Sequence, residues 1–253
     1  MQRYVLEVMY DGTQFHGSQI QGDLPTVQLA MNRAISTLLR TPLETFGASR
    51  TDEGVHALCN YYHFDYEGTL RPDFLYKCNA VLPFGVAVRH LYCAFSPDFN
   101  ARFAAITRRY RYRIYRQKNP FLQGRALYYP YHLDIDSLHQ TAQVIPQYTH
   151  FESFSKRNTQ SKTFICHLTK SEWLQTDNEL QYVVEGNRFL RGMVRGLVGT
   201  QLQAARHQLS LSDFRAIIDG NDCTKAYFNV TGNGLYLEHI GYPDGSLELL
   251  QTA

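Results

Sequence analysis

The segment from Gly47 to Ala57 contains the residue best suited to do chemistry, Asp52. Arg50 stands two positions before it, and the glycines at both sides let the backbone bend sharply and expose the side chains between them. A neighbouring guanidinium would keep the carboxylate ionised and hold its orientation. Carboxylates are also common in ordinary turns, where they bond their own backbone, so this stretch alone favours a structural aspartate. The rest of the chain has to decide between the two roles.

Basic residues are concentrated in three stretches without Asp or Glu, although the net charge of the 253-residue chain is only +2. Residues 99–133 contain seven arginines and one lysine, residues 153–171 contain four basic side chains, and residues 186–212 contain four arginines. A single run of this kind is usually a solvated face of the protein. Three such runs favour a surface that binds a polyanion.

The densest basic segment alternates arginine with tyrosine and predicts a strand over residues 107–115. Because side chains alternate along a strand, the arginines share one face and the tyrosines the other. The guanidiniums are spaced for phosphates, and arginine beside aromatic rings suits RNA. The alternative is a sheet strand with packed tyrosines and solvated arginines. The residues concerned are Arg109, Arg111 and Arg113 on one face, and Tyr110, Tyr112 and Ile114 on the other.

A second basic stripe is expected on a long helix over residues 188–206. Arg188, Arg191 and Arg195 follow the i, i+3, i+7 spacing of one helix face. Apolar residues form a separate stripe. Such a helix could bury one side and present its arginines to an anionic partner.

The motifs of several other chemistries are absent from the sequence. It has no phosphate-binding loop, no dinucleotide fingerprint and no nucleophile elbow. The pairs His56-x-x-Cys59 and His90-x-x-Cys93 resemble halves of a metal site. Residues three apart on a strand point to opposite faces, however, so we expect no metal. Chemistry without a cofactor on an anionic polymer is what remains.

The cysteine pattern and hydropathy indicate a cytoplasmic protein. The five cysteines are odd in number and form no Cys-x-x-Cys pair, which favours a reducing compartment. No apolar run approaches the length of a membrane span, and the N-terminus has no signal-peptide pattern. We therefore expect no membrane association.

The elements read from the sequence predict an α+β fold, with helices on one face of a largely antiparallel sheet. Strands outnumber helices and most connections are short. Two similar halves could meet near residues 100–106. The expected strands are 3–10, 43–46, 55–64, 86–95, 107–115, 163–173, 181–185 and 235–242, and the expected helices are 25–40, 73–78, 135–145, 188–206 and 210–218.

Several short motifs occur in a fixed order along nearly the whole chain. They include Tyr10-Asp11-Gly12, Phe15-His16-Gly17, Thr26-Val27-Gln28, Arg50-Thr51-Asp52, Gly54-Val55-His56-Ala57, Asn100-Ala101-Arg102-Phe103, Arg109-Tyr110-Arg111-Tyr112, Met193-Val194-Arg195 and Gly234-Leu235-Tyr236-Leu237. In these motifs and their order the chain resembles the TruA family of tRNA pseudouridine synthases. The element around Asp52 is the most specific of them.

This resemblance implies two RRM-like α+β halves that share a largely antiparallel central sheet, with a basic cleft between the halves. We expect an N-terminal half, residues 1–103, that carries the catalytic aspartate, and a C-terminal half, residues 104–253, that completes the cleft. The resemblance also implies a homodimer that holds one tRNA across both subunits and works without cofactor or metal.

The activity implied is the isomerisation of uridine to pseudouridine at positions 38 to 40, in the anticodon arm of tRNA. Asp52 matches the catalytic aspartate, and Arg50 matches the arginine that pairs with it. Tyr110 matches an aromatic residue that packs on the target base, and Leu235 matches an apolar residue of the pocket. The residues expected to bind the RNA chain are Arg109, Arg111, Arg188, Arg191 and Arg195.

Three residues depart from the family pattern. Ser18 replaces the usual tryptophan, in a loop expected to touch RNA. Ser49 replaces a glycine. Because residues other than glycine rarely adopt a positive φ, we expect a negative φ at this position if the serine is tolerated. Glu53 replaces an alanine, and it would raise the pKa of Asp52 only if it pointed inward.

Other functions remain open at this point. The chain could be a pseudouridine synthase for another RNA, such as ribosomal RNA, or a non-catalytic RNA-binding paralogue. A carbohydrate hydrolase is a third alternative, but such enzymes need a second, well-placed carboxylic acid.

Overall fold

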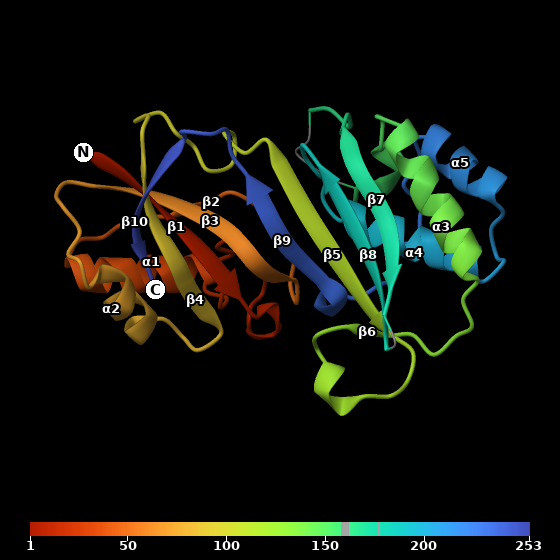
Figure 1. Ribbon diagram of the computed structural model, residues 1–253, viewed down its shortest axis with the longest axis horizontal. Helices are drawn as coiled ribbons and strands as arrows, with labels where there is room; N and C mark the ends of the chain where they lie inside the picture. Colours follow the sequence, from red (N-terminus) through yellow and green to blue (C-terminus); the bar gives the residue numbers. More distant parts are fainter. Residues whose placement is uncertain (158–161, 177) are drawn as a thin grey trace. The chain divides into compact units, whose positions relative to one another are not determined.

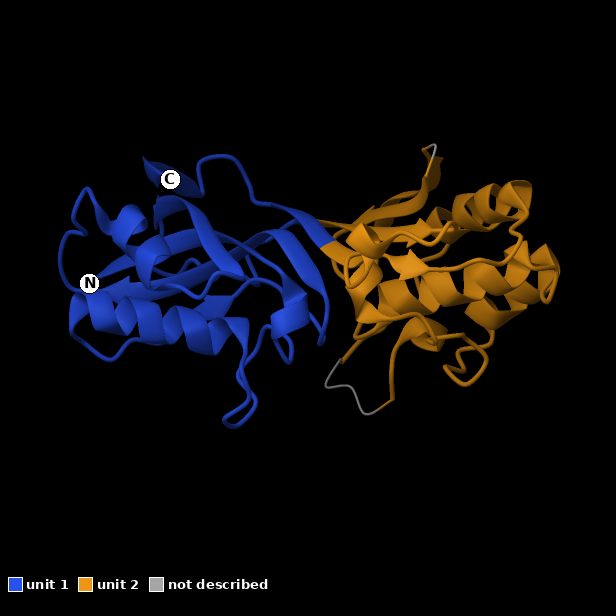
Figure 2. Cartoon of the chain, turned by 90° about the horizontal axis from the view of Figure 1, so that it is seen from below, with its two compact units in different colours: residues 1–106, 237–253 blue, residues 107–236 orange. Residues whose placement is uncertain are grey.

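The computed structural model describes residues 1–157, 162–176 and 178–253, which form two compact units (Figure 2). Unit 1 contains residues 1–106 and 237–253, and unit 2 contains residues 107–236. The halves expected from the sequence divide the chain once, after residue 103. In the structure, the C-terminal residues 237–253 belong to unit 1 together with the N-terminal residues. The physical reason is that β10 (Leu247–Thr252) pairs with β4 (Val86–Ala94), so both termini lie in the same unit.

The sheet of unit 1 is antiparallel and is built around β1 (Gln2–Tyr10). This strand lies between β3 (His56–Tyr66) and β4, and the two-residue strand β2 (Phe46–Gly47) pairs with β3. Most side chains of β1 are buried. The expected strand over residues 3–10 is therefore confirmed, and it forms the centre of the unit 1 core.

Two α-helices belong to unit 1, α1 (Val27–Leu39) and α2 (Phe74–Val81) (Figure 1). The helix α1 begins after Thr26, whose side chain accepts a hydrogen bond from the Leu29 amide, as expected of an N-cap. A short 3-10 helix, η1 (Gly12–Gln14), follows β1 directly. It starts the loop that leads to α1 and, as described below, supports the candidate active site.

The sheet of unit 2 contains β5 (Thr107–Tyr115), β8 (Glu179–Gly186) and β7 (Leu168–Gln175), paired antiparallel in that order. The short strand β6 (Leu127–Tyr128) runs parallel to β5. The strand β9 (Leu235–Gly241) begins in unit 2 and ends in unit 1. The 3-10 helices of unit 2 are η2 (Pro120–Leu122), η3 (Ile145–Gln147), η4 (Glu152–Phe154) and η5 (Gly232–Gly234).

Three α-helices pack together in unit 2. The helix α3 (Ile135–Val144) contacts β7, α4 (Met193–Ala205) and α5 (Leu211–Asp219). Figure 1 shows these three helices grouped next to β7 in the same unit. The fold is thus α+β with mostly antiparallel strands, as the sequence predicts. In the described part of the chain, no helix is long and apolar enough to cross a membrane.

The helix predicted over residues 188–206 is shorter than expected, and this prediction was wrong at its start. Gly192 has φ 74 and is the N-cap residue of α4, so the helix begins only at Met193. A left-handed backbone cannot continue a right-handed helix, and glycine adopts it without strain. Arg188 and Arg191 therefore lie in the irregular segment before α4, and only Arg195 lies on the helix. The predicted stripe of three arginines on one helix does not form.

Candidate active site

Asp52 lies in a tight turn of unit 1, between β2 and β3. The Val55 amide donates a hydrogen bond to the Asp52 carbonyl at 3.2 Å, and Gly54 has φ 75. A positive φ at the third position is the mark of a type II turn, which explains the glycine. The side chain of Asp52 is half-buried. The bend predicted around this residue is confirmed.

The loop that follows β1 packs against this turn so closely that only glycine fits at position 12. A Cβ at Gly12 would stand 2.1 Å from the Val55 carbonyl oxygen, far inside contact distance. The Gly12 amide donates to Nδ1 of the buried His56 at 3.2 Å. These contacts tie η1 to the end of the turn, and they join two motifs that are more than forty residues apart.

All three polar groups of Thr51, the neighbour of Asp52, are bonded. Its amide donates to Ser18 Oγ at 2.8 Å, and its carbonyl accepts from the Ser18 amide at 3.0 Å. Its hydroxyl is 2.8 Å from the Tyr10 hydroxyl. Ser18 is 2% exposed. The serine that replaces the tryptophan of the family pattern is therefore buried, and it supports the turn through hydrogen bonds.

A buried amide supports the other end of the turn. Asn60 accepts from the Ser49 amide at 3.2 Å and donates to the Ser49 carbonyl at 3.1 Å. It also donates to the Tyr10 hydroxyl at 3.2 Å. Sequence reasoning missed this residue. The signal was present, because an asparagine within an apolar and aromatic strand has to be hydrogen-bonded once it is buried.

The two other departures from the family pattern fit this geometry. Among the described non-glycine residues, only Arg40, His207 and Asn221 have a positive φ, so a serine at position 49 causes no backbone strain. Glu53 is exposed, and its Oε1 lies 3.6 Å from Nδ1 of His16. It therefore points to the surface rather than into the core beneath the turn.

Arg50 is exposed and lines a pocket of about 280 Å³ in unit 1. Its pairing with Asp52 stays a prediction. The described residues around the pocket are mostly polar, with two arginines and no carboxylate. They are Ser18, Gln19, Gln28, Phe46, Gly47, Ser49, Arg50, Tyr62, Asn100, Arg102 and Phe103.

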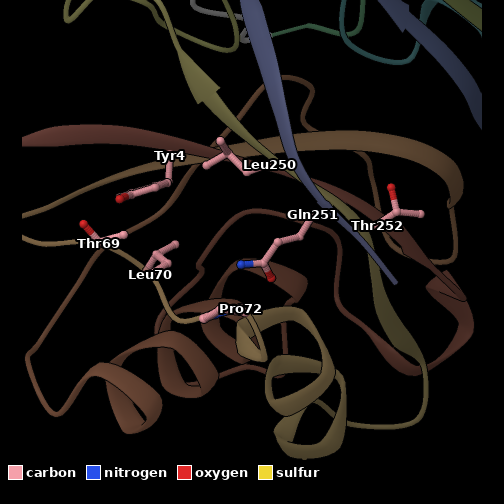
Figure 3. A pocket seen from close by; sticks show the side chains of 7 residues that line it. All are labelled: Tyr4, Thr69, Leu70, Pro72, Leu250, Gln251 and Thr252. Atoms are coloured by element: carbon pink, nitrogen blue, oxygen red, sulfur yellow. The ribbon is translucent and has the colours of Figure 1, made fainter.

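A second pocket of unit 1, of about 460 Å³, is not formed by the turn that carries Asp52. Figure 3 shows the side chains around it, which come from β1, from the segment before α2 and from β10. The Gln251 amide links two of these elements, because it accepts from the Leu75 amide and donates to the Arg71 carbonyl. The lining residues are Tyr4, Thr69, Leu70, Pro72, Leu250, Gln251 and Thr252, and none of them carries a formal charge at neutral pH.

Tyr110 and Leu235 lie in unit 2, whereas Asp52 and Arg50 lie in unit 1. Tyr110 is on β5 and is 8% exposed, and the ring of Phe189 packs on it edge-to-face at 5.0 Å. Leu235 is buried at the start of β9. Phe189 was not among the predicted site residues, although it belongs to the same aromatic cluster. A common site for Asp52 and Tyr110 stays a prediction.

The arginines of β5 share one face, as predicted, but β8 supplies carboxylates to them. Arg109 Nε donates to Glu185 at 2.6 Å, and Arg113 makes two hydrogen bonds to Glu179 at 2.6 and 2.8 Å. The pKa of Glu179 is held below its ordinary value, mainly by the hydrogen bonds from Arg113. Arg111 donates to the neutral Gln181. The arginine face of β5 therefore has carboxylates opposite its guanidiniums, and it does not offer a purely basic surface.

The third basic stretch differs from β5 in this respect. Within the described ranges, neither Arg188 nor Arg191 forms an ion pair, and Arg191 is exposed. Arg195 donates from Nε to the Val230 carbonyl at 2.8 Å. In the second stretch, residues 158–161 lie outside the described residues, and Lys170 pairs with Glu172 at 2.8 Å. The segment before α4 is thus the better candidate for binding an anion.

No group of three or more His, Cys, Asp or Glu side chains in the described part of the chain could hold a metal ion. His56, one of the residues weighed as a metal ligand, accepts the Gly12 amide with Nδ1 instead.

These features define a class: an α+β protein that presents a carboxylate from a rigid turn and carries arginines without ion pairs, as an enzyme acting on a polyanion would. Comparison with known proteins is more specific. A family model described as tRNA pseudouridine synthase matches residues 149–243. A tRNA pseudouridine synthase A from Bacteroides fragilis is 41% identical, with 98% of this chain and 99% of that protein covered.

Two further relatives with the same name extend the comparison. The protein from Bacteroides thetaiotaomicron is 38% identical over 96% of this chain and 92% of its own length. The protein from Staphylococcus aureus MW2 is 31% identical over 97% of this chain and 92% of its own length. The chain belongs to the tRNA pseudouridine synthase family, and it is therefore an RNA-modifying isomerase.

Proposed function

We propose that this protein converts uridine to pseudouridine at positions 38 to 40 in the anticodon arm of tRNA, as a cytoplasmic homodimer that needs no metal or cofactor. The observation that carries the proposal is the half-buried Asp52 on a turn held by Ser18, Asn60 and Gly12. Relatives of nearly the same length bear the name tRNA pseudouridine synthase A, which supports tRNA as the substrate. The five cysteines are free thiols, which fits a reducing compartment.

In the proposed reaction no atom is gained or lost overall. The bond between N1 and C1′ breaks, the uracil turns, and C5 forms the new bond to C1′. A carboxylate at Asp52 could attack C1′ as a nucleophile, or it could stabilise positive charge on the sugar. The proton that leaves C5 is balanced by the proton that N1 gains.

Access to the uridine requires that it leave the helix of the anticodon arm. Bases that react are flipped into a pocket and held there by stacking on aromatic rings. Tyr110 is proposed to receive the uracil, with Phe189 packed edge-to-face behind it and Leu235 as an apolar wall. Arg50 is proposed to orient Asp52.

The RNA backbone is proposed to lie along the arginines of unit 2. Arg188 and Arg191 contribute most in this proposal, because they lack carboxylate partners among the described residues. Arg195, Arg109 and Arg111 are proposed as weaker contacts, since protein acceptors already bind their guanidiniums.

The test of this function is the variant Asp52→Asn, which keeps the size of the side chain and removes its charge. We expect it to bind tRNA as the wild type does, and to release tritium from 5-tritiated uridine about a thousandfold more slowly. Glu53→Gln is the matched control, because it removes an exposed carboxylate one residue away. Full turnover by Asp52→Asn would refute the role of Asp52. Mapping pseudouridine in RNA from cells without this protein then identifies the sites, and a loss outside the anticodon arm would refute the proposed target.

A further inference from the structure

The pocket beside Arg50 has a composition that suits a nucleotide. Two exposed arginines, Arg50 and Arg102, lie on it together with two exposed aromatic residues. Phe46 is 49% exposed and Phe103 is 78% exposed. No carboxylate is among the described residues that line the pocket, so this wall does not oppose an anion. Cations for a phosphate beside aromatic rings for a base are the pattern of single-stranded nucleic-acid sites.

The loop that carries Arg102 and Phe103 is held rigidly, although both side chains are exposed. Asn100 accepts hydrogen bonds from the amides of Arg102 and Phe103 through its side chain, at 3.0 and 3.3 Å. The Ala101 amide donates to Nδ1 of the buried His63, and the Ala101 carbonyl accepts from the Tyr242 hydroxyl at 2.8 Å. The Arg102 guanidinium lies over the Phe103 ring, 5.4 Å from its centre, so the fixed turn presents a cation and an aromatic ring together.

A second observation points to an occupant. Tyr62 lines the pocket and is 1% exposed, yet its hydroxyl has no hydrogen-bond partner among the described residues. Ser18 lies near this hydroxyl without the geometry of a hydrogen bond. One edge of the Tyr62 ring (Cδ1, Cε1 and Cζ) lies beside Gly47, another lining residue, since a Cβ at Gly47 would stand 3.0 to 3.5 Å from these atoms. Buried hydroxyls are nearly always satisfied, and a donor left unpaired in the protein alone can be satisfied by a ligand.

We infer that this pocket of unit 1 is a subsite for one nucleotide of the RNA chain next to the target uridine. Arg102 holds its phosphate, Phe103 or Phe46 stacks on its base, and the Tyr62 hydroxyl bonds to it. The subsite adjoins the target because Ser49 and Arg50 line it and lead directly into the turn of Asp52. The inference rests on the proposed function for the place of the target uridine, whereas the binding of RNA in this pocket is tested separately.

The test measures RNA binding in the Asp52→Asn background, where turnover is nearly abolished, so it does not depend on activity. We expect Arg102→Ala and Phe103→Ala each to weaken the binding of an anticodon stem-loop about tenfold. Arg102→Ala should also lower the slope of log affinity against log salt by about one. Arg71→Ala and Phe84→Ala are matched controls, because both residues are exposed in unit 1 and neither lines this pocket. Binding equal to that of the controls would overturn the inference.

A variant of the buried phenol tests its part in the subsite. Tyr62→Phe should leave the free protein at least as stable as the wild type, because it removes an unpaired hydroxyl, and yet weaken RNA binding. Unchanged binding would overturn the assignment of the phenol.

Crosslinking tests which nucleotide occupies the subsite. A photoreactive benzoylphenylalanine at position 103 should crosslink to a nucleotide next to the modified uridine. A crosslink to protein only, or to a distant nucleotide, would overturn the subsite, whereas failure of the wild type to form pseudouridine would overturn the proposed function alone.

Discussion

At the scale of single residues, the position of Asp52 depends on neighbours that do no chemistry. Thr51 precedes it and is bonded through its amide, its carbonyl and its hydroxyl, two of these to Ser18. A serine can accept and donate at this buried site, whereas the ring of a tryptophan has no acceptor. The departure from the family pattern at position 18 is therefore compensated locally, because this chain holds the turn with a hydroxyl.

Removal of that hydroxyl should affect catalysis more than binding. We expect Ser18→Ala to leave the buried Thr51 amide without its acceptor and to cost about 1–3 kcal/mol of unfolding free energy. The loosened turn should lower kcat with little change in KM, because misplacement of Asp52 affects the chemical step. Denaturation and single-turnover kinetics measure the two effects.

Thr37→Ala is the control for this variant, since Thr37 loses an exposed hydroxyl bonded within α1. If Ser18→Ala were destabilised but had the kcat of the wild type, the serine would support the fold and not the position of Asp52.

The sequence indicates the proposed catalytic residue more directly than the residues that hold it. Asp52 and the bend at Gly54 can be recognised from a short stretch of chain. Ser18 and Tyr10 cannot, because they bond Thr51 from 33 and 41 residues away. Contacts of that kind are set by how β1 and the following loop pack, and one sequence contains no direct signal of them.

At the scale of elements, the pairing of β5 with β8 changes the meaning of the arginines. Residues 99–133 contain no acid, which indicated an unopposed basic face. The opposing carboxylates, Glu179 and Glu185, belong to a segment about seventy residues further along the chain. A charge pattern read along one strand omits the neighbouring strand, and antiparallel pairing brings opposite charges together.

The ion pair between Arg113 and Glu179 should therefore act on stability rather than on RNA binding. The pKa of Glu179 is lowered from 4.5 in the folded protein. Its contribution is thus fully present above that ordinary value, and it is lost as the pH falls through the lower folded value. We expect Arg113→Gln to lose about 1–3 kcal/mol at pH 7. The difference from the wild type should shrink toward pH 3, as urea denaturation across this range would measure.

Arg191→Gln is the contrasting variant, because Arg191 is exposed and precedes α4. It should change stability by less than about 0.5 kcal/mol and weaken tRNA binding. The opposite pattern, with RNA binding lost in Arg113→Gln and unchanged in Arg191→Gln, would return the phosphate-binding role to the β5 face.

Elements with a strong local pattern were predicted nearly to the residue, and those fixed by tertiary contacts were not. The expected helix 25–40 contains α1, and the expected strand 107–115 is β5. The start of α4 was misplaced because Gly192 adopts a left-handed conformation inside an otherwise helical pattern. The strand β10 was missed because most of its side chains are exposed and only its pairing with β4 defines it.

At the scale of the whole molecule, the residues proposed for catalysis are divided between the two units. Asp52 belongs to unit 1, and Tyr110 and Leu235 belong to unit 2. The chain passes into unit 2 after residue 106 and returns to unit 1 after residue 236, so one continuous polypeptide supplies both sets of residues. A dimer adds a second copy of every one of these residues. It raises the question of which subunit supplies the arginines for a given Asp52.

The proposed homodimer predicts that two inactive chains can complement each other. If one tRNA spans both subunits, Asp52 of one copy works on RNA held by the arginines of the other. We expect Asp52→Asn and the double variant Arg188→Ala, Arg191→Ala to have little activity as separate homodimers. Heterodimers purified through two different tags should regain up to about half of the wild-type rate, because one of the two sites is then complete.

The control for this complementation is a heterodimer in which both changes are made in the same chain and the partner is wild type. If each subunit binds and modifies its own RNA, that control should have one working site while the mixed heterodimer has none. If the RNA spans the dimer, the control chain contributes neither a working aspartate nor its arginines, so it leaves the wild-type Asp52 without RNA contacts from the other subunit. The two arrangements of the same substitutions therefore give opposite rates, and the faster heterodimer identifies whether the tRNA crosses the subunit boundary.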